Sequence, residues 1–96
     1  MKVLVIDDDQ IVCSSLKTII NQDPFIDVIA TGNDGNEAID LYFTYQPDVL
    51  LMDIRMDQMN GIDAGAHILG KEPKAKILFL TTFLDDKYII KALNMG

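Results

Sequence analysis

Short apolar runs alternate along this chain with stretches in which apolar residues recur at the spacing of a helix. Short apolar runs bounded by polar or turn residues are typical of strands that are buried on both faces, as in a parallel sheet. The pattern therefore predicts four strands, at Lys2–Ile6, Phe25–Thr31, Asp48–Asp53 and Lys76–Leu80.

The stretches between and after these strands predict four helices. The first carries Ile11, Val12, Leu16, Ile19 and Ile20 and ends between Asn21 and Pro24. The second spans Asn36–Tyr45 and offers Ala38, Ile39, Leu41 and Tyr42 to the core. The third follows Gly61, carries Ile62, Ala66, Ile68 and Leu69, and is ended by Gly70 and Pro73. The fourth starts at Asp85-Asp86.

This alternation of strands and helices predicts an α/β fold built from right-handed βαβ units. The sheet is expected to be parallel, covered by helices on both faces, and doubly wound with strand order 2-1-3-4, as in flavodoxin-like proteins. No repeats, linkers or low-complexity segments interrupt the pattern, so residues 1–96 are expected to form one domain.

Composition excludes several classes of protein. Hydrophobic residues make up 49% of the 96 residues, and no apolar run approaches the length of a membrane span, so we expect a cytoplasmic protein. The net charge of −7 argues against binding of a nucleic-acid backbone by this chain itself. Cys13 is the only cysteine and His67 the only histidine, and we expect both to have packing or surface roles.

Carboxylates follow two of the expected strands directly. Asp7, Asp8 and Asp9 follow the first strand, and Asp53 ends the third. In strand order 2-1-3-4 these two strands are neighbours, so Asp7, Asp8 and Asp53 should converge at the carboxyl edge, where α/β proteins bind ligands. The alternative is that the three consecutive acids only cap the first helix and that Asp53 only caps a turn. Asp9 is expected to be such a cap.

Three converging carboxylates repel one another and either take up a proton or bind a cation. Because every donor atom is oxygen, the cation should be hard, and Mg²⁺ fits best because it accepts carboxylates and phosphate oxygens as ligands. A carboxylate beside Mg²⁺ is also a competent nucleophile toward a phosphoryl group. Thr81, at the end of the fourth strand, is placed to donate a hydrogen bond to a phosphoryl oxygen.

Three motifs in this order resemble the receiver domain of bacterial two-component response regulators. They are Val5-Ile6-Asp7-Asp8-Asp9, then Met52-Asp53-Ile54-Arg55-Met56 with Met59-Asn60-Gly61, and then Leu80-Thr81-Thr82-Phe83. The resemblance implies that Asp53 accepts a phosphoryl group from a sensor histidine kinase. It also implies that Asp7, Asp8, Asp53 and the backbone carbonyl of Arg55 hold Mg²⁺, and that Thr81 is the switch hydroxyl. The last motif looks most like the LuxR/NarL-type subfamily, which implies control of a DNA-binding helix-turn-helix output domain and hence of transcription.

The chain also departs from the pattern of the family. Asp57 stands where the family usually has proline, and the sequence stops before the family's fifth strand and helix, with their phosphate-binding lysine. Lys87 and Lys91 lie on the expected fourth helix and do not replace that lysine. We therefore expect a receiver domain that is incomplete at its C-terminal end, with the apolar strand Ile77–Leu80 as a bare edge and the first helix partly uncovered. Such a chain is expected to self-associate, to exchange elements between copies, or to be the ordered part of a longer polypeptide.

Two other functions fit part of the sequence. Asp7 and Asp9 imitate the nucleophile pair of Mg²⁺-dependent phosphatases of the haloacid-dehalogenase type, although Gln10-Ile11 replaces the Gly-Thr of that family. A receiver-like protein that does not react with phosphate and acts only by protein binding is the third reading. Labelling by a small phosphodonor, without turnover of a phosphomonoester, is expected only for the first reading.

Overall fold

The computed structural model describes residues 1–56 and 59–80. Its elements are β1 (Lys2–Ile6), α1 (Gln10–Ile20), β2 (Asp27–Gly32), α2 (Gly35–Tyr45), β3 (Val49–Asp53), α3 (Gly61–Lys71) and β4 (Ile77–Leu80). The expected fourth helix and Thr81 lie outside the described residues. Within the described ranges, no helix is long and apolar enough to cross a membrane.

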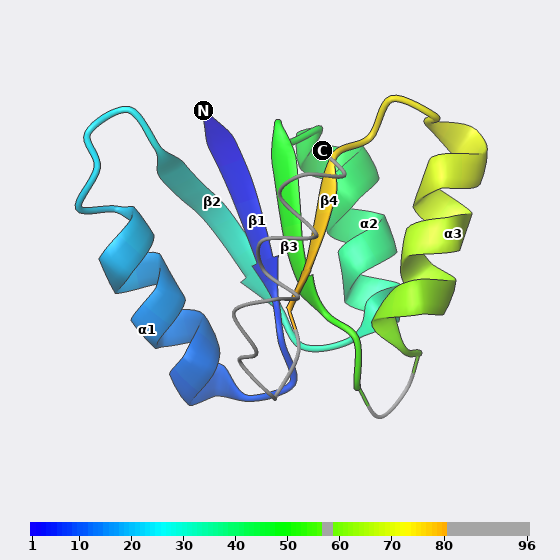
Figure 1. The fold of residues 1–96 in the computed structure, drawn as a ribbon, viewed down its shortest axis with the longest axis horizontal. Helices are drawn as coiled ribbons and strands as arrows, with labels where there is room; N and C mark the ends of the chain where they lie inside the picture. The colour runs from blue at the N-terminus through cyan, green and yellow to red at the C-terminus, as the bar shows by residue number, and fades with distance from the viewer. Residues whose placement is uncertain (57–58, 81–96) are drawn as a thin grey trace.

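The four strands form one parallel sheet in the order β2-β1-β3-β4, which confirms the predicted topology. Figure 1 shows α1 on one face of the sheet and α2 with α3 on the other. The sheet is therefore the middle of three layers, as expected when right-handed crossovers place helices on both faces of a parallel sheet.

The two faces of β1 bury alternate side chains in two separate cores. Leu4 and Ile6 belong to the core under α2 and α3, whose other buried members are Ala38, Tyr42, Leu50, Met52, Met56, Ala64 and Ile68. Val3 and Val5 belong to a smaller core under α1, together with Cys13 and Val28. Because the strand is buried on both sides, its sequence is continuously apolar instead of alternating.

The second strand begins later than the sequence predicted. Phe25 and Ile26 precede β2, and Phe25 is 82% exposed. The Asp23 side chain accepts a hydrogen bond from the Phe25 backbone N–H at 2.9 Å, and the Phe25 carbonyl accepts one from the N-terminal ammonium group of Met1 at 2.7 Å. A side-chain turn therefore holds Phe25 outside the sheet despite its high strand propensity.

The helices face the sheet with fewer large side chains than their apolar patterns suggested. On α1, Cys13 is buried and Leu16 half-buried, whereas Ile11 and Ile19 are 77% and 62% exposed. On α3, Ile62 and Ala66 are exposed and the buried residues are Gly61, Ala64, Gly65 and Ile68. An added Cβ at Gly65 would lie 2.9 Å from the Phe79 ring, so small residues let α3 pack close to β4.

Candidate functional site

The register between β1 and β3 brings the acidic residues together. Ile6 pairs with Met52, so the next residues along the two strands, Asp7 and Asp53, emerge side by side at the carboxyl edge of the sheet. The Asp7 backbone N–H also donates to the Gly32 carbonyl at 3.0 Å, which ties the end of β1 to β2. Backbone pairing of the two central strands therefore places both carboxylates at the carboxyl edge of the sheet.

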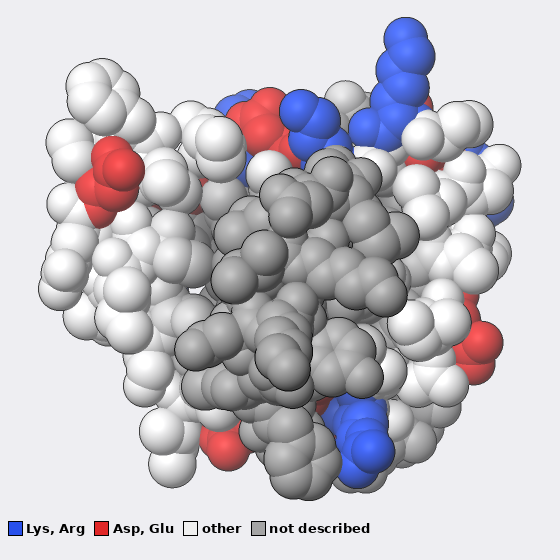
Figure 2. All heavy atoms as spheres, viewed as in Figure 1, with Lys and Arg blue, Asp and Glu red and all other residues white. Residues whose placement is uncertain are grey.

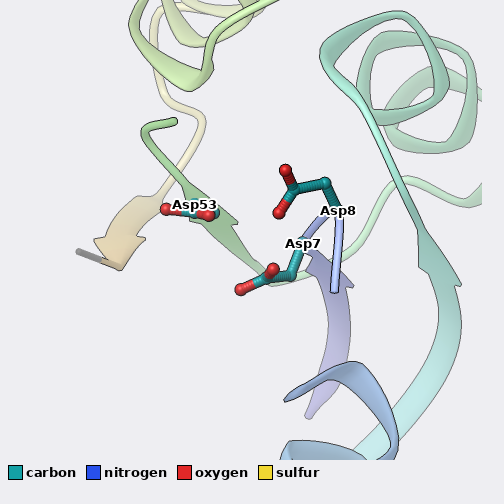
Figure 3. Close-up of side chains that lie close together, drawn as sticks. All are labelled: Asp7, Asp8 and Asp53. Atoms are coloured by element: carbon teal, nitrogen blue, oxygen red, sulfur yellow. The ribbon is translucent and has the colours of Figure 1, made fainter. Parts of the chain in front are cut away.

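Asp7, Asp8 and Asp53 form a cluster in which one carboxylate oxygen from each lies within 4.8 Å of the others. Figure 3 shows the Asp7 and Asp8 side chains projecting from the end of β1 toward the side on which Asp53 lies. Asp7 and Asp53 are each only 6% exposed, whereas Asp8 is exposed to solvent. The sequence predicted this convergence, and no other group of three or more His, Cys, Asp or Glu residues that could hold a metal ion is found in the described part of the chain.

Burial and mutual repulsion both disfavour the charged forms of these carboxylates. Burial, together with the charges of Asp53 and Asp8, raises the pKa of Asp7 to about 6, although the Asp9 backbone N–H donates to its Oδ1 at 2.9 Å. Burial also raises the pKa of Asp53, with a further contribution from the Asp8 charge. A divalent cation would remove this cost, because it stabilises the deprotonated form of each carboxylate.

Asp9 has the capping role that the sequence predicted. It is the N-cap of α1, and its Oδ1 accepts a hydrogen bond from the Ile11 backbone N–H at 2.9 Å. Asp9 is not a member of the carboxylate cluster. One of the three consecutive acids therefore starts the helix, and the other two face Asp53.

Most of the described lysines lie at one end of the sheet. Lys2, Lys71, Lys74 and Lys76 lie at or before the starts of β1 and β4, at the amino edge of the sheet. Figure 2 shows Lys and Arg side chains along the upper edge of the molecule, which Figure 1 identifies as that edge, with acidic side chains among them and basic atoms also at the lower edge. The acidic cluster therefore lies at the opposite end from most of the described lysines, and the Arg55 charge also acts on Asp53 there.

The segment after Asp53 folds back on the end of β3. The Arg55 backbone N–H donates to Asp53 Oδ1 at 3.3 Å, and the Gly61 backbone N–H donates to the Ile54 carbonyl at 2.8 Å. A Cβ added at Gly61 would overlap the carbonyl oxygen of Asp53. The role expected for Arg55 concerns its carbonyl oxygen and stays a prediction, whereas its N–H orients the Asp53 carboxylate directly.

The end of β4 lies next to Asp53. Leu80 pairs with Asp53 in the ladder, and its carbonyl accepts a hydrogen bond from the Ile54 backbone N–H at 3.1 Å. Thr81 is the next residue after Leu80 and lies outside the described residues, so its role as the switch hydroxyl stays a prediction.

The remaining candidates take no part in the cluster. Cys13 is buried, and its thiol donates to the Asp7 carbonyl at 3.4 Å, so it packs beneath the β1–α1 connection as expected. His67 is exposed on α3. The sequence predicted Gly61 only as the end of a loop and did not predict its close approach to the Asp53 carbonyl oxygen. A glycine directly after the helix cap Asn60 was the available signal for a close backbone approach.

The donor set of the cluster fits Mg²⁺. Three carboxylates offer only hard oxygen ligands, and neither the buried thiol of Cys13 nor the imidazole of His67 belongs to the group. Mg²⁺ binds through few protein carboxylates and keeps several waters, which a partly open cluster permits. The exposed Asp8 leaves the cluster accessible from solvent.

Comparisons with known proteins agree on one family. Residues 3–96 match the model of the response regulator receiver domain. The transcriptional regulatory protein DegU of Brevibacillus brevis is 35% identical over 96 residues, which are all of this chain and 41% of DegU. The chain spans 41% to 46% of the length of such curated relatives, less than half in each case.

Solved structures of similar proteins have the same fold. A two-component response regulator of the LuxR family from Aurantimonas sp. SI85-9A1 superposes with a TM-score of 0.83 at 30% identity, covering 99% of this chain and 68% of that one. The response regulator TrrA of Thermotoga maritima, in complex with Mg²⁺ and BeF, gives a TM-score of 0.78 at 29% identity. That match covers 86% of this chain and 70% of TrrA.

Proposed function

Since the chain belongs to the family of response regulator receiver domains, with relatives of the LuxR/NarL type, we propose that residues 1–96 form one receiver domain that accepts a phosphoryl group on Asp53. The observation that carries the proposal is the position of Asp53. It is a buried carboxylate at the carboxyl edge of a parallel sheet, within 4.8 Å of two further carboxylates. The proposed donor is the phosphohistidine of a sensor histidine kinase in a phosphorelay.

In the proposed reaction, a carboxylate oxygen of Asp53 attacks the phosphorus atom, and the bond between phosphorus and the histidine nitrogen of the donor breaks. The electron pair of that bond stays on the histidine. The Arg55 N–H donates to Asp53 Oδ1 and so limits the rotation of the nucleophile. An oriented nucleophile supports transfer because a positioned reactant has already lost its rotational freedom.

We propose that Asp7, Asp8, Asp53 and the backbone carbonyl of Arg55 hold Mg²⁺. When bound, the ion supplies positive charge next to the phosphoryl oxygens, where negative charge must be stabilised during transfer. Asp7 and Asp53 lie close together on neighbouring strands and repel each other, so both carboxylates gain from sharing a cation.

The output of the proposed domain depends on residues outside the described part of the chain. Thr81 is proposed as the switch hydroxyl that binds the phosphoryl group on Asp53. The relatives named transcriptional regulatory proteins are more than twice as long as this chain, which supports a role in transcription through a separate DNA-binding domain.

Self-association is proposed through the exposed Ile11 and Ile19 of α1. The place of action is proposed to be the cytoplasm.

The phosphatase alternative has less support from the geometry. That reading needs Asp7 and Asp9 to act as a pair, but Asp9 accepts the Ile11 N–H as the helix cap. The domain is therefore proposed to modify itself and to have no metabolic substrate. Incubation with a phosphomonoester should give no more than stoichiometric release of phosphate.

The test of the proposed function is labelling by acetyl phosphate, followed by intact-mass spectrometry. With Mg²⁺ the chain should gain the mass of one phosphoryl group, and Asp53→Asn should abolish the gain. Asp40→Asn is the matched control, because Asp40 is an exposed acid on α2. Equal labelling of Asp53→Asn and wild type would show that Asp53 is not the acceptor. No labelling of wild type would favour the receiver-like protein that acts by binding alone.

A further inference from the structure

The first turn of α2 is hydrogen-bonded to the segment that returns from the candidate site. The Gly35 backbone N–H donates to the Met59 carbonyl at 3.2 Å. The N-cap residue Asp34 accepts the Glu37 N–H at 2.9 Å, so two N–H groups at this helix end have partners outside the helix ladder. One of those partners belongs to the connection between β3 and α3.

The approach of Met59 to Gly35 is closer than any other residue at position 35 would permit. An added Cβ would lie 2.6 Å from the Met59 carbonyl oxygen and 2.8 Å and 2.9 Å from its Cβ and Cγ atoms. None of these three atoms is the far end of the Met59 side chain, so relief requires movement of the Met59 backbone. Gly35 is also buried, so no open space is available on its own side.

A displacement of Met59 would be transmitted to Asp53 through the next two residues. Met59 is followed by Asn60 and Gly61, and the Gly61 N–H donates to the Ile54 carbonyl at 2.8 Å. Gly61 also lies against the Asp53 carbonyl oxygen, where a Cβ would overlap it. A displacement imposed at Met59 is therefore transmitted to the backbone of Asp53 and Ile54 by close packing and a hydrogen bond.

We propose that Gly35 is a positioning residue for the acceptor site: its missing side chain lets the Met59–Gly61 segment close onto the end of β3 and fix the place of Asp53. The proposal rests on the proposed function, because it assigns Gly35 a role in that site. Gly35 itself contacts neither the phosphoryl group nor the metal. It acts through Met59 and Gly61.

A small displacement of Asp53 should have a measurable effect. Mg²⁺ requires near-ideal octahedral geometry, and the distance between Asp53 and the two acids that follow β1 sets part of that geometry. Misplacement of a reacting group by about 1 Å can reduce a rate by a factor on the order of a hundred. The effect of a change at Gly35 should therefore appear first in metal affinity and labelling rate, with a smaller effect on folding.

Gly35→Ala is the direct test. Alanine is intrinsically better than glycine in a helix, so any loss reports the contact with Met59 and not helix propensity. In the metal-free protein, the amide resonances of Arg55 and Gly61 should shift, because their hydrogen bonds hold Asp53 and Ile54. The dissociation constant for Mg²⁺ should rise by about tenfold, and labelling of Asp53 by acetyl phosphate should slow by a similar factor.

Two other glycines provide matched controls. Gly70, on α3, has nothing within 4 Å of an added Cβ, so Gly70→Ala should leave Mg²⁺ affinity unchanged. Gly65 is crowded to a similar degree, with an added-Cβ distance of 2.9 Å to Phe79 Cζ. That atom is a side-chain tip, so Gly65→Ala should reduce stability without a tenfold loss of Mg²⁺ affinity. An equal loss of affinity in Gly65→Ala and Gly35→Ala would overturn the proposal.

A measurement on the wild-type chain tests the same coupling if Gly35→Ala does not fold. If the Gly35–Met59 hydrogen bond and the metal site depend on each other, then Mg²⁺ should slow hydrogen exchange of the Gly35 amide, because coupling between two sites is reciprocal. The Glu37 amide, which is bonded to Asp34 and not to Met59, should change less. Equal slowing at Gly35 and Glu37, or no slowing at Gly35, would contradict the proposal.

The results also separate this inference from the proposed function. A wild-type chain that neither binds Mg²⁺ nor reacts with acetyl phosphate refutes the proposed function. The shifts of Arg55 and Gly61 in metal-free Gly35→Ala still decide whether Gly35 sets the position of Asp53. A wild-type chain that is labelled normally, with unchanged resonances and affinity in Gly35→Ala, refutes the inference alone.

Discussion

Asp7 and Asp53 lie together because the residues before them, Ile6 and Met52, are direct partners in a parallel ladder. Both side chains are buried at the edge of the sheet, and both have a raised pKa. Their burial and proximity therefore destabilise the metal-free protein when the carboxylates are charged, and this loss of stability can be measured.

The first prediction concerns pH. The pKa of Asp7 is about 6 in the folded protein against 3.8 as its ordinary value, so the folded state holds this proton more tightly than the unfolded state. Its contribution to the free energy of unfolding is fully present below pH 3.8 and is lost as pH rises through 6. The full contribution is on the order of 3 kcal/mol.

Urea titrations of metal-free wild type and Asp7→Asn at several pH values measure this contribution. The difference in unfolding free energy between the two proteins should change between pH 4 and pH 6.5, with wild type losing stability relative to the variant as pH rises. Subtracting the variant removes the pH dependence that the two proteins share. A difference that is constant with pH would show that Asp7 titrates normally.

The second prediction is weak and local Mg²⁺ binding. Few rigid ligands are available to replace the waters of the ion, so the affinity should be low, and it should rise with pH as Asp7 loses its proton. A titration followed by NMR should perturb amides near Asp7, Asp8 and Asp53. Perturbation confined to residues 34–37, at the start of α2, would place the metal elsewhere.

The third prediction concerns Gly61. Gly61→Ala places a Cβ onto the Asp53 carbonyl oxygen, where backbone must move, so the free energy of unfolding should fall by about 2–3 kcal/mol. Thermal or urea unfolding measures the loss, and labelling by acetyl phosphate should slow as well. Gly70→Ala has open space and a helical backbone, so it should stabilise the protein by up to about 1 kcal/mol.

The fourth prediction is a stabilising change far from the site. Gln46 ends α2 with φ of 48°, a left-handed conformation that favours glycine, and its N–H donates to the Tyr42 carbonyl at 2.8 Å. Gln46→Gly should keep this bond and raise the free energy of unfolding by about 0.5–1 kcal/mol. Gln46→Ala should give no such gain. Equal midpoints in urea for the two variants would argue against left-handed strain at this position.

The fifth prediction concerns switching. Thr81→Ala should leave labelling of Asp53 largely intact, because the hydroxyl binds the product and is not the nucleophile. It should remove the chemical-shift changes that phosphorylation causes at Phe83 and Tyr88 in the wild-type chain. Identical changes in the two proteins would rule out Thr81 as the switch hydroxyl.

Strand order and the acidic cluster could be predicted from sequence because each depends on a strong constraint. Parallel strands end at the same edge, so carboxylates after two adjacent apolar runs had to meet there. The face of α3 could not be predicted in the same way. Ala64 and Gly65 are buried, whereas the larger Ile62 is exposed. The helix lies so close to Phe79 that small side chains fit on the buried face better than large apolar ones.

The contact between Gly35 and Met59 also could not be predicted from the sequence. The two residues are distant in the chain, neither is titratable, and a glycine next to a helix cap is common in any loop. Phe25 shows the reverse case, because strand propensity predicted a strand residue and a local turn at Asp23 overrode it. Backbone approach distances and side-chain turns depend on the assembled fold, and apolar periodicity does not report them.

The double-sided burial of β1 limits how this strand can change in length. Inserting one residue before Ile6 would exchange the side chains of the two cores, because alternate residues face opposite sides. Inserting two would restore the alternation but carry Asp7 about 6.6 Å farther along, away from Asp53. Insertions and deletions that preserve the site should therefore fall outside β1, for instance in the α1–β2 turn around the exposed Phe25.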